Sequence, residues 1–195
     1  RYNDGEDVGL GGGYAASGHW ENSERWKQSA AGILMACRRL ISSWTPSVLD
    51  VGCGRGRMVR ELRALGARSI GVDIGFDSAM AETCAVGSVT DLPFQPVRGG
   101  IRRLAVFDVV VALDVIEHVP ADYQKRVVRE LARVTKRLLL VTVPTREPHF
   151  AHDSKSGIRH HYLSLSEAAW VAVIEEGGFF RRIEAGLQGI GPPFA

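Results

Sequence analysis

The chain contains 195 residues, of which 45% are hydrophobic and 24% charged, and its formal net charge at pH 7 is +2. This composition favours a single α/β domain and lacks the strong basic charge that marks many nucleic-acid or membrane binders. No stretch is apolar enough to span a membrane, and the three cysteines are widely spaced, so we expect a soluble cytoplasmic protein with no membrane partner.

The N-terminal region is expected to divide into an arm and the start of the domain. Residues 1–19 are rich in glycine, aspartate and tyrosine, which favours a flexible arm or lid ahead of one domain over 20–195. Within the arm, Tyr14 is a candidate contact to a bound cofactor. From Ser23 to Ile41 apolar residues recur at spacings of three and four, which predicts an amphipathic helix.

A glycine-rich turn follows the first predicted strand, at residues 48–51. Gly52, Gly54 and Gly56 alternate, and Asp50 stands two residues before the first of them. Glycine adopts backbone torsions that other residues resist, and a strand, a glycine turn and a helix together can cradle a nucleotide-like cofactor. The dinucleotide pattern Gly-x-Gly-x-x-Gly would need a glycine where Arg57 stands, so the spacing argues against a dinucleotide.

The rest of the chain alternates between helical and strand patterns. The predicted elements are a helix over 57–65, strands over 69–74, 84–88 and 107–114, a helix over 122–134, a strand over 137–143, a helix from Ser164 to Gly177 and a sixth strand after it. Ser164 and Glu167 form a capping-box pattern at the start of the last helix. The continuous apolar runs of the fourth and fifth strands favour a parallel sheet covered on both faces.

Four motifs in order resemble the class I S-adenosylmethionine (SAM)-dependent methyltransferases, in particular the small type 11-like enzymes. They are Asp-x-Gly-x-Gly-x-Gly at 50–56, Ser-Ile-Gly-Val-Asp-Ile at 69–74, Gly-Ser-Val-Thr-Asp-Leu-Pro-Phe at 87–94, and the strand over 107–114, which ends at an acid, with the Val-Ile-Glu-His-Val run after it. The resemblance implies a doubly wound, mostly parallel Rossmann-like sheet of the seven-stranded type. The last strand would be short or missing here.

The same resemblance implies SAM as the cofactor, S-adenosylhomocysteine (SAH) as its product, and a site at the ends of the first four strands. An acid at Asp50 suits the ammonium group of SAM, and Asp73 suits the ribose hydroxyls, because a carboxylate accepts two hydrogen bonds. Asp91 would accept a hydrogen bond from the adenine amine, and the Leu92 backbone N–H would donate to the ring. The full set is Asp50, Gly52, Cys53, Gly54, Gly56, Asp73, Ile74, Asp91, Leu92, Asp114 and Tyr14. Within it, the Cys53 side chain is interpreted as packing.

Five of the six histidines lie between residues 118 and 161, and three interpretations of them remain open. They are surface residues, or one of His118, His160 and His161 is a general base for the methyl acceptor. Alternatively, a divalent metal is held by Asp114, Glu117, His118 and His160, which are reasonable ligands for such ions. This last set is similar to the metal-binding pattern of enzymes that 2′-O-methylate RNA 3′ ends, although those begin with Glu where Asp114 stands.

The sequence therefore predicts a SAM-dependent methyltransferase whose acceptor is a hydroxyl or amine of a small molecule, such as a sugar or secondary metabolite. One alternative is a metal-dependent 2′-O-methyltransferase of RNA 3′ ends, with nucleic acid as the partner. A second alternative, from another class, is a SAM-binding regulatory protein without turnover.

Overall fold

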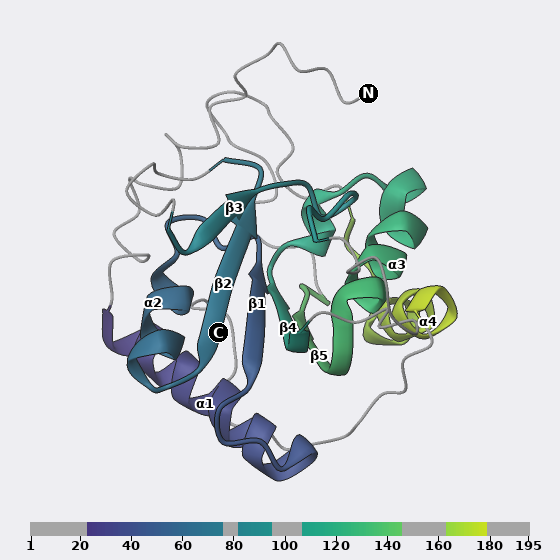
Figure 1. The fold of residues 1–195 in the computed structure, drawn as a ribbon. Coiled ribbons are helices and arrows are strands. Elements are labelled where there is room, and N and C mark those ends of the chain that lie inside the picture. Colours follow the sequence, from purple (N-terminus) through teal and green to yellow (C-terminus); the bar gives the residue numbers. More distant parts are fainter. Residues whose placement is uncertain (1–22, 76–81, 95–106, 146–162, 179–195) are drawn as a thin grey trace, which may run out of the picture.

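Five parallel strands form the centre of the computed structural model, which describes residues 23–75, 82–94, 107–145 and 163–178. Their order across the sheet is β3-β2-β1-β4-β5 (Figure 1). The strands are β1 (Ser47–Val51), β2 (Arg68–Asp73), β3 (Cys84–Val86), β4 (Phe107–Leu113) and β5 (Thr135–Thr142). All four neighbouring pairs run parallel, as the apolar strand pattern predicted.

Helices cover both faces of this sheet. Figure 1 shows α1 (Ser23–Ile41) and α2 (Arg57–Ala64) on one side, and α3 (Gln124–Val134) and α4 (Glu167–Gly178) on the other. Two short 3₁₀ turns, η4 (Ile116–His118) and η5 (Ala121–Tyr123), lie between β4 and α3. The doubly wound α/β fold is therefore confirmed. No helix in the described part of the chain is long and apolar enough to cross a membrane.

The side chains of the central strands alternate between two apolar layers, one on each face of the sheet. In β1, Val48 packs with the α1 and α2 side, whereas Leu49 packs with the layer that contains Trp170 of α4. In β4, Val109 and Val110 divide in the same way. Successive strand residues point to opposite faces, so a strand buried on both sides must be apolar at nearly every position.

Most observed element boundaries differ from the sequence expectation by one to three residues, and the starts of α4 and β5 are two examples. The capping box predicted at Ser164 is wrong, because α4 begins at Glu167 and the Ala169 N–H donates to Ser166 Oγ at 3.3 Å. Strand β5 begins at Thr135, earlier than predicted and directly after the last residue of α3. The arm over 1–19 and the positions of the expected sixth and seventh strands lie outside the described residues.

The strand order reverses between β1 and β4, because the chain runs outward from β1 through β2 to β3 and then returns to add β4 and β5. In open parallel sheets, ligands bind outside the carboxyl ends of the strands at such a switch point. The segments that follow β1 and β4 both lie at this switch point, and they carry the glycine turn and the residues from Asp114 to His118.

Candidate cofactor site

The glycine turn connects β1 to α2 and is tied to the neighbouring strand. The backbone N–H groups of Gly52 and Cys53 both donate to Val72 O of β2, at 2.7 and 3.2 Å. The φ angles of Gly52, Gly54 and Gly56 are +73°, +50° and +64°, all in the left-handed region. Residues with a side chain rarely adopt this region, so the alternating glycines are needed for the turn itself.

Two of these glycines have opposite surroundings. A Cβ atom added to Gly52 would overlap the Val115 side chain, which follows β4. At Gly54, by contrast, an added Cβ would meet no atom within 4 Å. Gly52 therefore allows the turn and the β4 segment to approach closely at the switch point, and Gly54 leaves open space above the turn.

Asp73, at the end of β2, is held beside this open space. Its Oδ2 accepts the Gly54 N–H at 2.8 Å and its Oδ1 accepts the Gly75 N–H at 3.0 Å. Each carboxylate oxygen can accept more than one hydrogen bond, so both retain capacity for a ligand hydroxyl. The structure therefore brings Gly54 and Asp73 together, as expected for a ribose-binding carboxylate.

Asp50 lies in β1 directly before the turn and is 5% exposed. Burial, reinforced by the negative charge of Asp73, raises the pKa of the Asp50 carboxyl to about 7. No described residue donates a hydrogen bond to it. A buried carboxyl without a donor favours a ligand that supplies a positive charge or N–H groups.

The Cys53 side chain points beneath the turn. Its Sγ lies 3.6 Å from Cys84 Sγ of β3. Both thiols pack over Gly71 of β2, where an added Cβ would come within 2.5 Å of Cys53 Sγ. Burial raises the pKa of the Cys53 thiol well above its ordinary range, with a further contribution from Asp50. These contacts support the packing interpretation of its side chain.

The segment after β3 differs from the expectation for the adenine contacts. Leu92 is fully buried, and its backbone N–H donates to Glu130 Oε2 of α3 at 2.9 Å. Because this N–H donates to Glu130, it is not available in this structure as the expected donor to an adenine ring. Asp91 is exposed, and its backbone N–H closes a turn by donating to Ser88 O at 2.9 Å.

Ser88 and Val89, which belong to the 87–94 motif but were not among the predicted site residues, come first after β3 and Gly87. The Gly87 N–H donates to Asp73 O at 2.9 Å, so the chain leaves β3 beside the end of β2. The Val89 backbone N–H has no partner among the described residues. Their position at a carboxyl strand end was the signal that could have identified them.

Two apolar side chains at the carboxyl ends of strands remain open to solvent. Ile74, after β2, is 63% exposed and Val86, the last residue of β3, is 66% exposed. A contiguous exposed apolar patch rimmed by polar groups can mark a ligand-binding site, whereas singly exposed apolar residues are common. Ile74 thus remains a candidate for contact with a flat apolar ring, and Val86 joins it.

The end of β4 carries a constrained acid. Asp114 has a φ of +54°, unusual for a residue other than glycine. Its backbone N–H donates to Thr142 O and Oγ1, and Thr142 Oγ1 donates to Asp114 Oδ1 at 3.0 Å. Burial raises the pKa of Asp114, and the hydrogen bond from Thr142 offsets only part of this increase. Strand β5 therefore fixes the orientation of this acid next to the glycine turn.

Glu117 and His118 lie in the 3₁₀ turn η4. Glu117 is fully buried, and neither of its carboxylate oxygens has a hydrogen-bond partner among the described residues. Burial raises its pKa to about 8, with a contribution from Asp114. The His118 side chain is half-buried, and its backbone N–H donates to Val115 O at 3.1 Å. Tyr14, His160 and His161 lie outside the described residues.

The metal candidates do not gather into a site within the described part of the chain. Over these residues no group of three or more His, Cys, Asp or Glu side chains could hold a metal ion. Asp114 is bonded to Thr142, while the Glu117 side chain is enclosed without a partner. The candidate ligands that the structure describes, Asp114, Glu117 and His118, therefore do not form a metal site by themselves.

Comparisons with known proteins agree with this geometry. A family model described as a methyltransferase domain matches residues 49–138. The ubiquinone biosynthesis O-methyltransferase of Nitrosococcus oceani is 37% identical over 79 residues, covering 37% of this chain and 33% of that protein. The protein of the same name from Escherichia coli is 36% identical over 93 residues, covering 46% and 38%. This chain therefore spans only about a third of the length of these curated relatives.

Solved structures resemble the fold over most of the chain. The Burkholderia thailandensis 1,6-didemethyltoxoflavin-N1-methyltransferase, with bound substrate and SAH, has a TM-score of 0.57 at 16% identity and covers 81% of this chain and 68% of its own. The magnesium protoporphyrin IX methyltransferase of Synechocystis has a TM-score of 0.56 at 19% identity, covering 80% and 74%. The sequence match and the structural likeness coincide from the glycine turn to β5: residues 49–138 match a methyltransferase domain, and the fold is similar to that of SAM-dependent methyltransferases.

Proposed function

We propose that the protein catalyses transfer of a methyl group from SAM to a hydroxyl oxygen of a small molecule. The observation that carries this proposal is that Asp73 accepts the N–H of Gly54, beside open space at the switch point of the sheet, with the buried Asp50 in β1 directly before the same turn. The choice of oxygen as the acceptor atom is supported by the names of the curated relatives, which are O-methyltransferases.

Each side of the open space suits one part of SAM. The Asp50 carboxyl, buried and without a donor, would pair with the ammonium group. Asp73 keeps one acceptor position on each oxygen for the two ribose hydroxyls. The Val89 N–H and the Ser88 side chain would meet the edge of the base, and Ile74 and Val86 would cover its faces.

SAM supplies an activated methyl group on a sulfonium, so the chain itself has mainly to hold and align the reactants. Alignment of reacting groups can provide several kcal/mol of the barrier reduction, up to about 7–11 in well-oriented cases. The fixed contacts of Asp114 and the close approach of Val115 to the glycine turn keep the ends of β1 and β4 in one arrangement. An acceptor bound over the end of β4 would then face the same crevice.

A hydroxyl acceptor must also lose a proton. His118 is the described histidine nearest in sequence to the end of β4, and its imidazole is the proposed general base, a role worth about 10²–10⁴-fold in rate. His160 and His161 stay predictions for the same role. No step of this proposal uses a metal ion.

The test combines binding with turnover. Calorimetry with SAH should give a 1:1 complex, and methyl-labelled SAM should label hydroxyl compounds in a panel of phenols, sugars, amines and short RNA 3′ ends. Label on amines alone would contradict the hydroxyl assignment, and label on RNA alone would support the RNA alternative. Binding of SAH with no methyl transfer to any acceptor class would favour the regulatory alternative.

Asp73→Ala is the variant that tests the cofactor assignment. It should weaken SAH binding by about 1.5–3 kcal/mol, the scale of hydrogen bonds to a charged group. An exposed acid elsewhere, Glu175 of α4, provides the control substitution Glu175→Ala, which should leave SAH affinity as in the wild type. Equal affinities of the Asp73→Ala variant and the wild type would refute the ribose role.

A further inference from the structure

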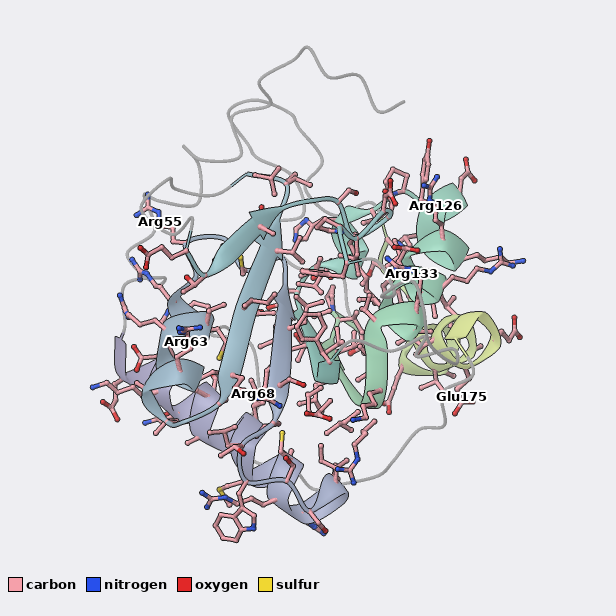
Figure 2. All side chains as sticks on the ribbon, in the orientation of Figure 1. Arg55, Arg63, Arg68, Arg126, Arg133 and Glu175 are labelled. Carbon is pink, nitrogen blue, oxygen red and sulfur yellow. The ribbon has the colours of Figure 1, made fainter. Side chains whose placement is uncertain are left out.

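Three charged side chains of α3 bind the backbone of the segment that follows β3. Arg126 Nε donates to Thr90 O at 2.7 Å, and Arg133 donates to Leu92 O at 2.9 Å and also to Phe94 O. With the third side chain the segment is the donor: the Leu92 N–H donates to Glu130 Oε2 at 2.9 Å. Figure 2 shows Arg126 and Arg133 on α3, on the side where the chain crosses over from β3.

Glu130 and Arg133 hold each other in place on α3. Arg133 Nη2 lies 2.6 Å from Glu130 Oε2, and the two side chains are only 23% and 17% exposed. Partial burial alone would raise the pKa of Glu130, but the hydrogen bonds from Arg133 and Leu92 outweigh it and hold the pKa below its ordinary value. Glu130 is therefore ionised at neutral pH and accepts from both partners at once. Charge-assisted bonds of this kind are stronger than neutral ones.

The anchored residues are connected to the proposed cofactor site through short contacts. Pro93 lies between the anchored Leu92 and Phe94, and a Cβ added to Gly87 would come within 2.6 Å of Pro93 Cδ. The Gly87 N–H in turn donates to Asp73 O. The intervening turn is closed by the Asp91 N–H on Ser88 O and by the Thr90 N–H on Ser88 Oγ. The position of Ser88 and Val89 thus depends on where α3 holds residues 90–94.

We propose that Arg133 and Glu130 are positioning residues that set the base end of the SAM site by clamping residues 90–94 onto α3; this rests on the proposed function for the identity of the ligand. The segment has no helix and only one isolated bridge of its own, so apart from the buried Leu92 side chain these α3 side chains are what holds its backbone. Loss of the clamp releases the Ser88–Val89 turn and leaves the glycine turn and Asp73 contacts intact.

The test uses Arg133→Met, with Glu130→Gln as a second variant and Arg129→Met as the matched control. Arg129 is an exposed arginine on the same helix. Arg133→Met should weaken SAH binding about tenfold or more, because it removes charge-assisted bonds to two carbonyls. It should weaken S-inosylhomocysteine, which carries a carbonyl in place of the adenine amine, by less than about threefold. The ratio of the SAH affinity to the S-inosylhomocysteine affinity should therefore decrease in Arg133→Met. Its kcat at saturating SAM should stay within about twofold of the wild-type value.

A merely structural role would weaken both ligands equally and leave their ratio unchanged, and that result would overturn the proposal. Amide hydrogen exchange provides a readout that needs no ligand. The peptide containing Leu92 should exchange faster in Arg133→Met and Glu130→Gln than in the wild type, and Arg129→Met should match the wild type. Unchanged exchange in both clamp variants would also overturn the proposal. Failure of the wild type to bind SAH would instead refute the proposed function, and the exchange result would still decide the clamp.

Discussion

Asp50 is a buried carboxyl whose pKa of about 7 depends on its surroundings. It must be ionised to pair with an ammonium group, so ligand binding should release one proton when the pH is below this value. We predict that SAH affinity rises about tenfold per pH unit below pH 7 and becomes constant above about pH 8. Calorimetry over this range, in buffers with different ionisation enthalpies, measures both the affinity and the proton release.

Asp50→Asn is the control for this prediction, because an amide does not titrate. Its SAH affinity should be weaker than that of the wild type at pH 8 and independent of pH between 6 and 8. A wild-type affinity that does not change over the same range would mean that Asp50 does not contact the ammonium group.

Gly52 and Gly54 differ in a way that the sequence pattern does not reveal. Both have positive φ angles, but only at Gly52 would a side chain overlap Val115. Gly52→Ala should therefore lower the free energy of unfolding by roughly 3 kcal/mol, from strain and overpacking together. Gly54→Ala should lower it by only about 1 kcal/mol, from strain alone. Urea denaturation measures both, and equal losses would argue against the close approach of the β4 segment.

At the scale of single elements, the start of α4 allows two serines to be compared as the N-cap of this helix. Ser166 Oγ accepts the Ala169 N–H, whereas Ser164 lies two residues earlier and is exposed. Ser166→Ala should lower the free energy of unfolding by about 1 kcal/mol, the usual cost of losing an N-cap. Ser164→Ala should change it by less than about 0.5 kcal/mol, as for ordinary surface substitutions. A larger loss of stability in Ser164→Ala than in Ser166→Ala, measured by thermal or urea unfolding, would support the capping box predicted from the sequence.

Helix α3 illustrates how one element serves two purposes. On its apolar side, Val127, Val128, Leu131 and Val134 are all buried against the sheet and α4. Its other side carries charged residues that the sequence alone does not connect with any partner. In the structure Glu130 and Arg133 instead bind the backbone of residues 92 and 94. The periodicity of a helix indicates which side is apolar, but it does not indicate what the polar side contacts.

At the scale of the whole molecule, the buried acids make stability depend on pH. Asp50 and Glu117 have pKa values of about 7 and about 8 in the folded protein. In the unfolded chain both ionise near pH 4. Between about pH 5 and 7 the folded state therefore binds more protons, and the free energy of unfolding falls as the pH rises. The slope is at most about 1.4 kcal/mol per pH unit for each group.

Urea denaturation of the ligand-free protein between pH 5 and 8 measures this slope. Glu117→Gln should make it shallower, because the amide has no charge to bury at any pH. The comparison uses the slope and not the absolute stability, since the amide also leaves polar atoms enclosed. Stability that increases over this interval in the wild type would show that these acids are solvated or paired in solution.

The sequence by itself determined the class of fold, the glycine turn and the two acids that frame it. These features are local, so they can be recognised in the sequence without knowing which segments meet in space. They are the glycines of the turn, the spacing of Asp50 and Asp73 from it, and the apolar periodicity of α1 and of the strands. The doubly wound sheet then follows, because apolar strands alternating with amphipathic helices leave few other ways to bury both faces.

Only the tertiary structure decided the features that join distant segments. The Leu92 amide binds Glu130, 38 residues away, and so is lost to the role expected for it. Gly52 faces Val115, and Glu117 is enclosed without a partner. Hydrogen-bond capacity, close packing and the desolvation that raises a pKa all depend on what surrounds a group in space, and this neighbourhood is created only when the chain has folded.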